Sequence, residues 1–469
     1  MREYIKERKR QGGRENMKET IEKQREFFAS GKTLDLKFRL EQLENFRQGV
    51  LRWEGEILRA LETDLGKPAF EAYETEVGLV LEEISFAKKH LRGWARPNRV
   101  RTPLLHFPSK SKIVKEPLGV VLIMSPWNYP FQLTMAPLAA VLAAGNCAVL
   151  KPSRYAAATA EVMEKLVRDC FSPEYVCLFQ GGRDVNAALL RERFDHIFFT
   201  GSVGVGKSVM RAAAEHLTPV TLELGGKSPV LVDQTADIDL AARRIVWGKC
   251  LNAGQTCVAP DYVLVQEEAR EELLRAMEKY IRMFYGAEPL KNPEYPKIIN
   301  TKHFARLSSL LPEGKIRCGG GTDPENRKIE PTLLEGVSAE DPVMQEEIFG
   351  PILPVLSFRE WDEALAFVKS REKPLALYLF TTDRAAKRRV LGEVSFGGGC
   401  INDTVVHLTN PHMHFGGVGQ SGMGAYHGKK GFYTFSHEKC ILEKSNALDI
   451  RFRYPPYGGR LSLLKKLMK

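Results

Sequence analysis

The chain has 469 residues, 43% hydrophobic and 27% charged, which is typical of a folded protein of two or three domains and excludes a disordered or fibrous one. The net charge of +10 owes much to residues 451–469, which carry six basic and no acidic side chains, so the charge does not indicate a nucleic-acid-binding protein. Eight scattered cysteines without a C-x-x-C pair favour a reducing, cytoplasmic location and argue against a disulfide framework.

The first part of the chain is predicted to be helical. Residues 1–17 read as a polar extension without the apolar core of a signal peptide. Between residue 18 and about residue 95, apolar residues recur at spacings of three and four, which predicts amphipathic helices. No run of 18 or more apolar residues occurs, so we expect no transmembrane segment.

From about residue 112, short apolar runs alternate with helix-like segments. This alternation predicts an α/β fold with a doubly wound parallel sheet, followed by a second α/β unit from about residue 225 to residue 423. Ligands of such sheets bind beyond the carboxyl ends of the strands. Those ends fall here in the segments SPWN, KPSR, TGS and LELGG.

The segment GSVGVGKS, residues 201–208, matches the phosphate-loop pattern G-x-x-x-x-G-K-[ST] at every position. A strand-like run precedes it and a helix-like segment follows, which is the context in which backbone N–H groups and a lysine bind nucleotide phosphates. The run PVLVD, residues 229–233, is similar to a strand that ends in a magnesium-binding aspartate. The residues alone therefore leave a nucleotide-hydrolysing protein open.

Three polar residues are candidates for covalent chemistry. Cys257 lies among small residues in NAGQTCVAP, which would let a substrate approach its thiol. Glu223 ends a predicted strand next to two glycines, and Asn128 lies between two prolines at another strand end. A carboxylate and an amide at these places would suit a general base and an oxyanion donor.

Seven motifs occur in the order and approximate spacing of the aldehyde dehydrogenase superfamily: SPWNYP, VLKPS, FTGS, LELGGKSP, GQTC, EEIFGP and FGGVGQSGMG. The segments YHG and GFYTFSH and the ending DIRFRYPPYGGRLSLLKKL resemble its class 3 branch, which includes fatty-aldehyde dehydrogenases. The resemblance covers nearly the whole chain from about residue 20. It makes GSVGVGKS a dinucleotide-binding turn in which the lysine is coincidental, and the phosphate-loop protein becomes a remote alternative.

The resemblance implies that an aldehyde is oxidised to the acid with NAD or NADP, through a thiohemiacetal and a thioester on Cys257. The side chain of Asn128 would hold the oxyanion, and Glu223 would activate the hydrolytic water. Contacts with the cofactor are implied for Trp127, Lys151, Gly201, Ser202, Gly206, Glu347 and Phe349. No metal is implied, and the three histidines of HLTNPHMH have an irregular spacing for metal ligands.

The resemblance also implies a division of the chain and a homodimer. The dinucleotide-binding domain would comprise residues 18–98 and 117–224, and the catalytic domain residues 225–423. Residues 99–116 and 432–446 would bridge subunits. Residues 447–469 form a basic tail, whose amphipathic end would suit either peripheral contact with an acidic membrane or packing on a neighbour.

Two positions bear on the reaction and the cofactor. A glutamate at position 223 favours hydrolysis to the free acid over the alternative of a coenzyme-A-acylating or specialised semialdehyde dehydrogenase of the same superfamily. Class 3 members commonly read KPSE, whereas this chain reads KPSR. Arg154 would therefore pair with the 2′-phosphate of NADP or, as the alternative, face solvent.

Overall fold

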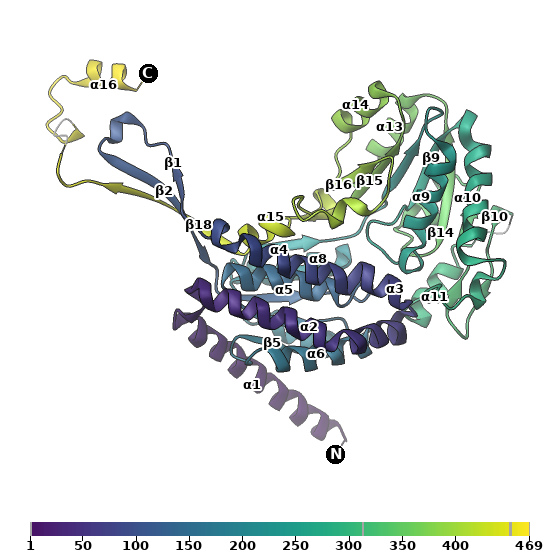
Figure 1. Cartoon of the computed structure of the whole chain (residues 1–469), viewed down its shortest axis with the longest axis horizontal. Coiled ribbons are helices and arrows are strands. Elements are labelled where there is room, and N and C mark those ends of the chain that lie inside the picture. The colour runs from purple at the N-terminus through teal and green to yellow at the C-terminus, as the bar shows by residue number, and fades with distance from the viewer. Residues whose placement is uncertain (1, 312–313, 450–452, 469) are drawn as a thin grey trace.

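The computed structural model describes residues 2–311, 314–449 and 453–468. Two α/β bodies lie side by side, and a narrow arm projects from the first of them (Figure 1). None of the described helices has the length and apolarity needed to cross a membrane.

The first body contains a six-stranded sheet in the order β17-β7-β6-β3-β4-β5. Its strands are parallel except β17, which pairs antiparallel with β7. The bounds are β3 Val120–Met124, β4 Cys147–Lys151, β5 Val176–Leu178, β6 His196–Thr200, β7 Val220–Glu223 and β17 Gly422–Met423. The central strands β3, β4 and β6 are buried along their whole length because helices cover both faces of the sheet.

Helices of this first body come largely from the first half of the chain. They are α1 Arg2–Ala29, α2 Leu36–Leu65, α3 Ala69–Ala72, α4 Gly78–Trp94, α5 Gln132–Ala144, α6 Ala157–Cys170, α7 Arg183–Leu189, α8 Val203–Ala214 and the late α15 Gly428–Thr434. Helix α2 packs on α6, and α4 packs on α5. Helix α1 crosses the boundary predicted after residue 17, and the Met17 side chain is buried in the core.

The second body contains a seven-stranded sheet in the order β10-β13-β14-β9-β8-β15-β16. Only its edge strand β10 is antiparallel to its neighbour. The bounds are β8 Pro229–Val232, β9 Tyr262–Gln266, β10 Ile316–Cys318, β13 Thr332–Leu334, β14 Ile352–Phe358, β15 Ala376–Phe380 and β16 Gly398–Ile401, with β11 Thr322–Asp323 and β12 Lys328–Ile329 as a separate pair. Its helices are α9 Ile238–Cys250, α10 Arg270–Tyr285, α11 Thr301–Ser308, α12 Pro342–Gln345, α13 Trp361–Lys369 and α14 Arg384–Glu393.

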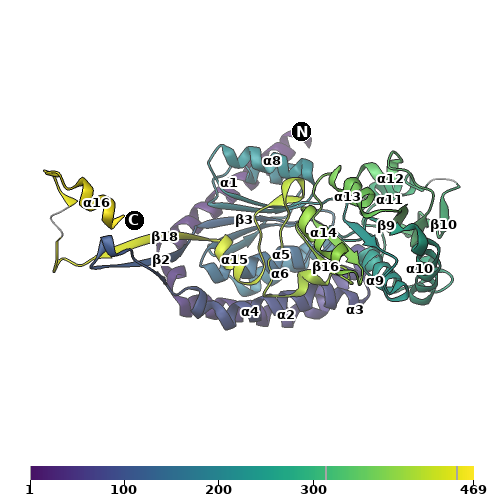
Figure 2. The same ribbon diagram turned by 90° about the horizontal axis from the view of Figure 1, so that it is seen from above.

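The arm is a three-stranded antiparallel sheet in the order β1-β2-β18. Its strands are β1 Asn98–Val100, β2 Ser109–Pro117 and β18 Ser436–Lys444, and the short helix α16 Leu461–Leu467 lies beyond the sheet (Figures 1 and 2). Residues 432–434, predicted as part of a bridging segment, instead end helix α15. Of the predicted basic tail, Arg451 and Lys469 lie outside the described residues.

The geometry of the segment 201–208 is incompatible with a phosphate loop. Strand β6 ends at Thr200 and helix α8 begins at Val203, so only two residues connect them. Lys207 is inside the helix and exposed. No long loop connects the strand to the helix, so Lys207 cannot fold back over a nucleotide's phosphates. The nucleotide-hydrolysing alternative is therefore wrong.

Candidate active site

Cys257 lies at the junction of the two bodies, after helix α9 and a tight loop. Asn252, Ala253 and Gly254 in this loop all have left-handed backbone conformations. Such conformations are strained for residues other than glycine and are found mainly at functional sites. The Cys257 thiol is only partly exposed, and burial, with the nearby carboxyl groups of Glu347 and Glu223, raises its pKa to about 12. The thiol is therefore protonated at rest in this form of the protein.

Glu223 ends strand β7, and both oxygens of its buried carboxyl group have no hydrogen-bond partner. Burial raises the pKa of Glu223 well above its usual range. Because its charge in turn raises the pKa of the Cys257 thiol, the two groups are neighbours. A desolvated, unpartnered carboxyl group beside a thiol is chemically costly in a folded protein and typical of a catalytic acid or base.

Asn128 follows strand β3 and is 2% exposed. Its side-chain nitrogen donates a hydrogen bond to the backbone carbonyl of Gln255, at 3.0 Å, two residues before Cys257. An amide nitrogen carries two hydrogens. One is engaged with Gln255, and the second makes no hydrogen bond within the described part of the chain.

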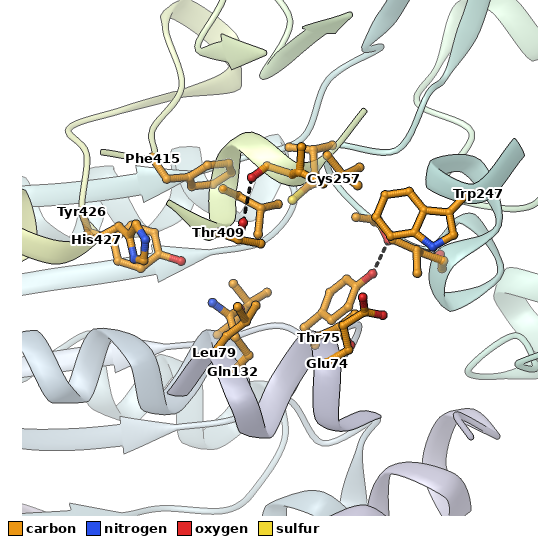
Figure 3. A pocket seen from close by; sticks show the side chains of 18 residues that line it. Glu74, Thr75, Leu79, Gln132, Trp247, Cys257, Thr409, Phe415, Tyr426 and His427 are labelled. Carbon is orange, nitrogen blue, oxygen red and sulfur yellow. Dashed lines mark hydrogen bonds between the residues drawn. The ribbon is translucent and has the colours of Figure 1, made fainter. Parts of the chain in front are cut away.

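A cavity of about 260 Å³ opens beside Cys257 (Figure 3). Its wall is mostly apolar and comes from both bodies; the apolar side chains include Leu79, Leu133, Trp247, Leu251, Val406 and Phe415. In Figure 3 the labelled Leu79 and Gln132 lie on the side of the first body, facing Trp247 and Cys257 of the second. Polar side chains of the wall include Glu74, Thr409 and His427. The cavity is suited to an apolar ligand whose reactive end meets the thiol.

Two of the predicted cofactor residues lie together. The rings of Trp127 and Phe349 are in edge contact, with centroids 5.4 Å apart, and the His303 ring also contacts Trp127, with centroids 5.0 Å apart. Glu347, two residues before Phe349, reaches back to the first body, where the Gly226 N–H binds its carboxylate. Burial raises the pKa of Glu347 to about 8, and its Oε1 is buried without a hydrogen-bond partner.

The remaining cofactor candidates lie at the carboxyl ends of β4 and β6, as predicted. Gly201 and Ser202 form the connection to helix α8, and a Cβ at Gly206 would lie 2.7 Å from Leu224, so only glycine lets the helix pack this closely. Lys151 is 3% exposed and Arg154 is exposed. Burial, and then the nearby charge of Arg154, lowers the pKa of Lys151 to about 8. Lys151 Nζ donates to the Pro152 carbonyl at 2.7 Å, and the Arg154 guanidinium lies 5.3 Å from the centre of the Tyr155 ring.

Sequence reasoning missed several residues of the site. Tyr129 and Thr256 join their hydroxyl groups at 2.6 Å beside the cavity, and Trp247 forms part of its wall. His427 also lines the cavity, 2.6 Å from Glu83, and no role for it was predicted. The adjacency of Tyr129 to Asn128 and of Thr256 to Cys257 was the one signal that pointed to them. Among the described residues, no cluster of three or more potential ligands could hold a metal ion.

Comparison with known proteins agrees with this geometry. Residues 3–441 match the model of the aldehyde dehydrogenase family. The chain belongs to this family. It is 50% identical over 445 residues to the 4,4′-diaponeurosporen-aldehyde dehydrogenase of Staphylococcus aureus, covering 94% of this chain and 97% of that protein. It is 45% identical over 448 residues to a rat aldehyde dehydrogenase described as dimeric and NADP-preferring, covering 95% and 99%.

A solved structure has nearly the same fold. The substrate-bound state of the Staphylococcus aureus enzyme AldH superposes with a TM-score of 0.95 at 49% identity, covering 97% of this chain and 99% of that one. These likenesses confirm the doubly wound α/β fold and the class 3 branch. The protein is thus an aldehyde dehydrogenase that oxidises an aldehyde to the carboxylic acid with NAD or NADP.

Proposed function

We propose that this aldehyde dehydrogenase oxidises apolar aldehydes to free acids, with Cys257 as nucleophile, Asn128 as oxyanion donor and Glu223 as general base. The observation that carries the proposal is the apolar cavity that ends at the Cys257 thiol, beside an unpartnered carboxyl group and an amide with a free hydrogen. The relative from Staphylococcus aureus is named as a 4,4′-diaponeurosporen-aldehyde dehydrogenase, which supports an aldehyde as the substrate class.

The residues divide the reaction between them. Cys257 first loses its thiol proton to solvent, and the thiolate sulfur attacks the aldehyde carbon. The Asn128 amide and the Cys257 N–H stabilise the resulting oxyanion, at about 3 kcal/mol per donor. Bound NAD or NADP would supply the hydride acceptor that this oxidation requires, and Cys257 would then carry the acyl group as a thioester. Glu223 then takes a proton from water, and the hydroxide displaces the sulfur to release the acid. Burial raises the pKa of Glu223, which makes its deprotonated form a stronger base toward water.

The residues around the cofactor candidates fit a dinucleotide. The first turn of α8 offers backbone N–H groups, and the Ser202 side chain makes no capping bond that would occupy them. Trp127 and Phe349 offer apolar ring surfaces, and the unpartnered Oε1 of Glu347 offers an acceptor for a ribose hydroxyl. Lys151 and Arg154 offer positive charge, which favours the extra phosphate of NADP.

We also propose a homodimer assembled through the arm, in which residues 99–116 and 435–446 bridge subunits. Large apolar side chains of the arm are exposed in the single chain, with Leu104 87% and Phe107 59% accessible. Exposure of this kind marks an interaction surface. Helix α16 also exposes Leu461 and Leu463 beside two lysines, which supports either the partner or an acidic membrane as its contact. The free cysteines support a cytoplasmic location.

A series of straight-chain aldehydes tests the proposed function. Each methylene that enters the cavity should raise kcat/KM by up to about fourfold, because burying one contributes about 0.8 kcal/mol. The product should be the free acid, and added coenzyme A should leave the rate and product unchanged. A preference for short or charged aldehydes, or formation of an acyl-coenzyme A, would contradict the proposal.

A further inference from the structure

A buried ion pair lies behind the active-site turn and takes no part in the steps described above. Lys67 and Glu76 both have fully buried side chains, and Lys67 Nζ is 2.5 Å from Glu76 Oε1. Lys67 follows helix α2, and Glu76 is in the π-helical turn Tyr73–Val77 that precedes helix α4. Desolvating two charges is costly, so such a pair is rarely explained by stability alone. Local π-helical turns are also frequent at functional sites.

The pair holds the turn 128–132 at both ends. Lys67 Nζ donates to the backbone carbonyl of Asn128 at 3.1 Å, and it lies 3.9 Å from the centre of the Tyr129 ring. Glu76 Oε2 accepts the N–H groups of Phe131 and Gln132, at 2.8 and 3.2 Å, where helix α5 begins. One ion pair therefore fixes the carbonyl at the start of the turn and the amides at its end.

The same turn is tied to the loop that carries the nucleophile. Asn252 Nδ2 donates to the Asn128 carbonyl at 2.7 Å, so Lys67 and Asn252 share this acceptor. Asn252 Nδ2 also lies 3.2 Å from the Gln255 carbonyl, the group that receives the Asn128 side chain. Glu71, four residues after Lys67, accepts the Asn252 N–H at 2.8 Å. The position of the Asn128 amide relative to Cys257 thus depends on a network that begins at the ion pair.

We propose that the Lys67–Glu76 pair is a positioning device for Asn128: it holds the side-chain amide where an oxyanion forms at Cys257, without touching the substrate. The inference rests on the proposed role of Asn128 as oxyanion donor. It implies that the pair affects reactions that pass through an oxyanion and leaves other reactions of the same thiol unchanged.

Two reactions of Cys257 that need no cofactor separate these effects. Acylation by 4-nitrophenyl acetate proceeds through a tetrahedral oxyanion, whereas alkylation by iodoacetamide displaces iodide and forms none. The test variant is Lys67→Met with Glu76→Gln, which removes both charges of the pair together and keeps an acceptor for the N–H groups of α5. Both rates are measured by mass spectrometry of the Cys257 peptide, and the acylation also by release of nitrophenolate. The control, Lys88→Met with Glu44→Gln, neutralises a partly buried pair between α4 and α2.

In the test variant, acylation should slow by about tenfold or more, and alkylation should stay within about twofold of wild type. Asn128→Ala alone should slow acylation by about 100-fold, and adding the test substitutions to it should change the rate by no more than about twofold. The inference is overturned if the test substitutions slow acylation and alkylation by the same factor. It is also overturned if they slow acylation as much in the Asn128→Ala background as in the wild type. Either result leaves the role of Asn128 intact. If Asn128→Ala acylates at the wild-type rate, the oxyanion assignment is wrong and the inference falls with it.

Should the test variant fail to fold, Lys67→Arg provides the second measurement. It keeps the charge and a hydrogen-bond donor but changes the reach of the side chain. The expected result is again a slower acylation with unchanged alkylation. If this folded variant slows both reactions by the same factor, or slows neither, the inference is overturned.

Discussion

Glu347 lies so close to the backbone of Gly225 that a β-carbon there would overlap its carboxyl group. The contact joins the loop before β14 in the second body to the end of β7 in the first. It therefore holds the predicted cofactor-binding carboxylate close enough to the Cys257 thiol to raise the pKa of that thiol.

Gly225→Ala should displace Glu347 and weaken binding of NAD and NADP. The added methyl group has no space beside the Glu347 carboxyl group. If that carboxyl group moves away, it loses its hydrogen bond from the Gly226 N–H. Cofactor affinity by fluorescence titration should fall by about tenfold or more, corresponding to at least one lost hydrogen bond to a charged group. Gly93→Ala is the control, since no atom lies within 4 Å of the place its added β-carbon would take. Equal affinities in the two variants would contradict the contact.

Cys257→Ser should abolish aldehyde oxidation while leaving cofactor affinity nearly unchanged. A serine hydroxyl in this site has neither the nucleophilicity of a thiolate nor a partner that activates it. Cys250→Ser is the matched control, because Cys250 is packed in the core of the second body and only stability should change. An inactive Cys250 variant with normal folding, beside an active Cys257 variant, would reverse the assignment.

Glu223→Gln should slow release of the acid more than formation of the thioester. Rapid mixing should then show a burst of reduced cofactor ahead of a slow steady rate, and mass spectrometry should find acylated Cys257. In the wild type, the release step should accelerate as pH rises through a pKa well above 4.5, because only the deprotonated carboxyl group accepts a proton. The variant should lack this dependence. Loss of the burst itself would show that Glu223 acts before the thioester forms.

Arg154→Glu should shift cofactor preference from NADP towards NAD. Arg154 lowers the pKa of Lys151, so removing the arginine should favour the charged form of the lysine. A carboxylate at position 154 nevertheless repels a 2′-phosphate directly. The preference, measured as the ratio of kcat/KM for the two cofactors, should change by about tenfold or more, since a charge-assisted contact is worth about 1.5–3 kcal/mol before screening. Arg154→Gln separates loss of charge from its reversal. A wild type that strongly prefers NAD, with no response to either change, would mean that Arg154 faces solvent.

The contact between His427 and Glu83 should make stability depend on pH. Burial lowers the pKa of His427, but the Glu83 carboxylate outweighs this, so the folded pKa lies above the ordinary 6.5. The pair therefore contributes fully below pH 6.5, and its contribution is lost as pH rises through the folded pKa. Urea unfolding at pH 6 and pH 9 should show a larger difference between wild type and His427→Gln at pH 6. A difference that is constant, or that grows with pH, would contradict the ion pair.

The sequence predicts the central strands of the two large sheets well because strands such as β3, β4, β6, β8 and β15 are buried along their whole length and read as short apolar runs. It also predicts Asn128, Lys151, Gly201 and Glu223 at strand ends, where the parallel topology gathers them. The cavity wall was not predictable, since its side chains come from segments as distant as Leu79 and Phe415. The Lys67–Glu76 pair was missed for a different reason: in a helical region, two charges nine residues apart read as solvated groups until tertiary packing buries them.

The arm has a consequence for how the chain is made. Strand β18 pairs with β2 along nine residues, from Ser436 opposite Pro117 to Lys444 opposite Ser109. More than 300 residues separate the two strands. Strand β2 therefore leaves the ribosome long before β18 is synthesised, and it lacks this pairing partner in the meantime. At about 5–20 residues per second, that wait is of the order of tens of seconds. During this interval, the unpaired strand is open to wrong partners, and chaperone binding near residues 109–117 would protect the nascent chain until its own C-terminal strand arrives.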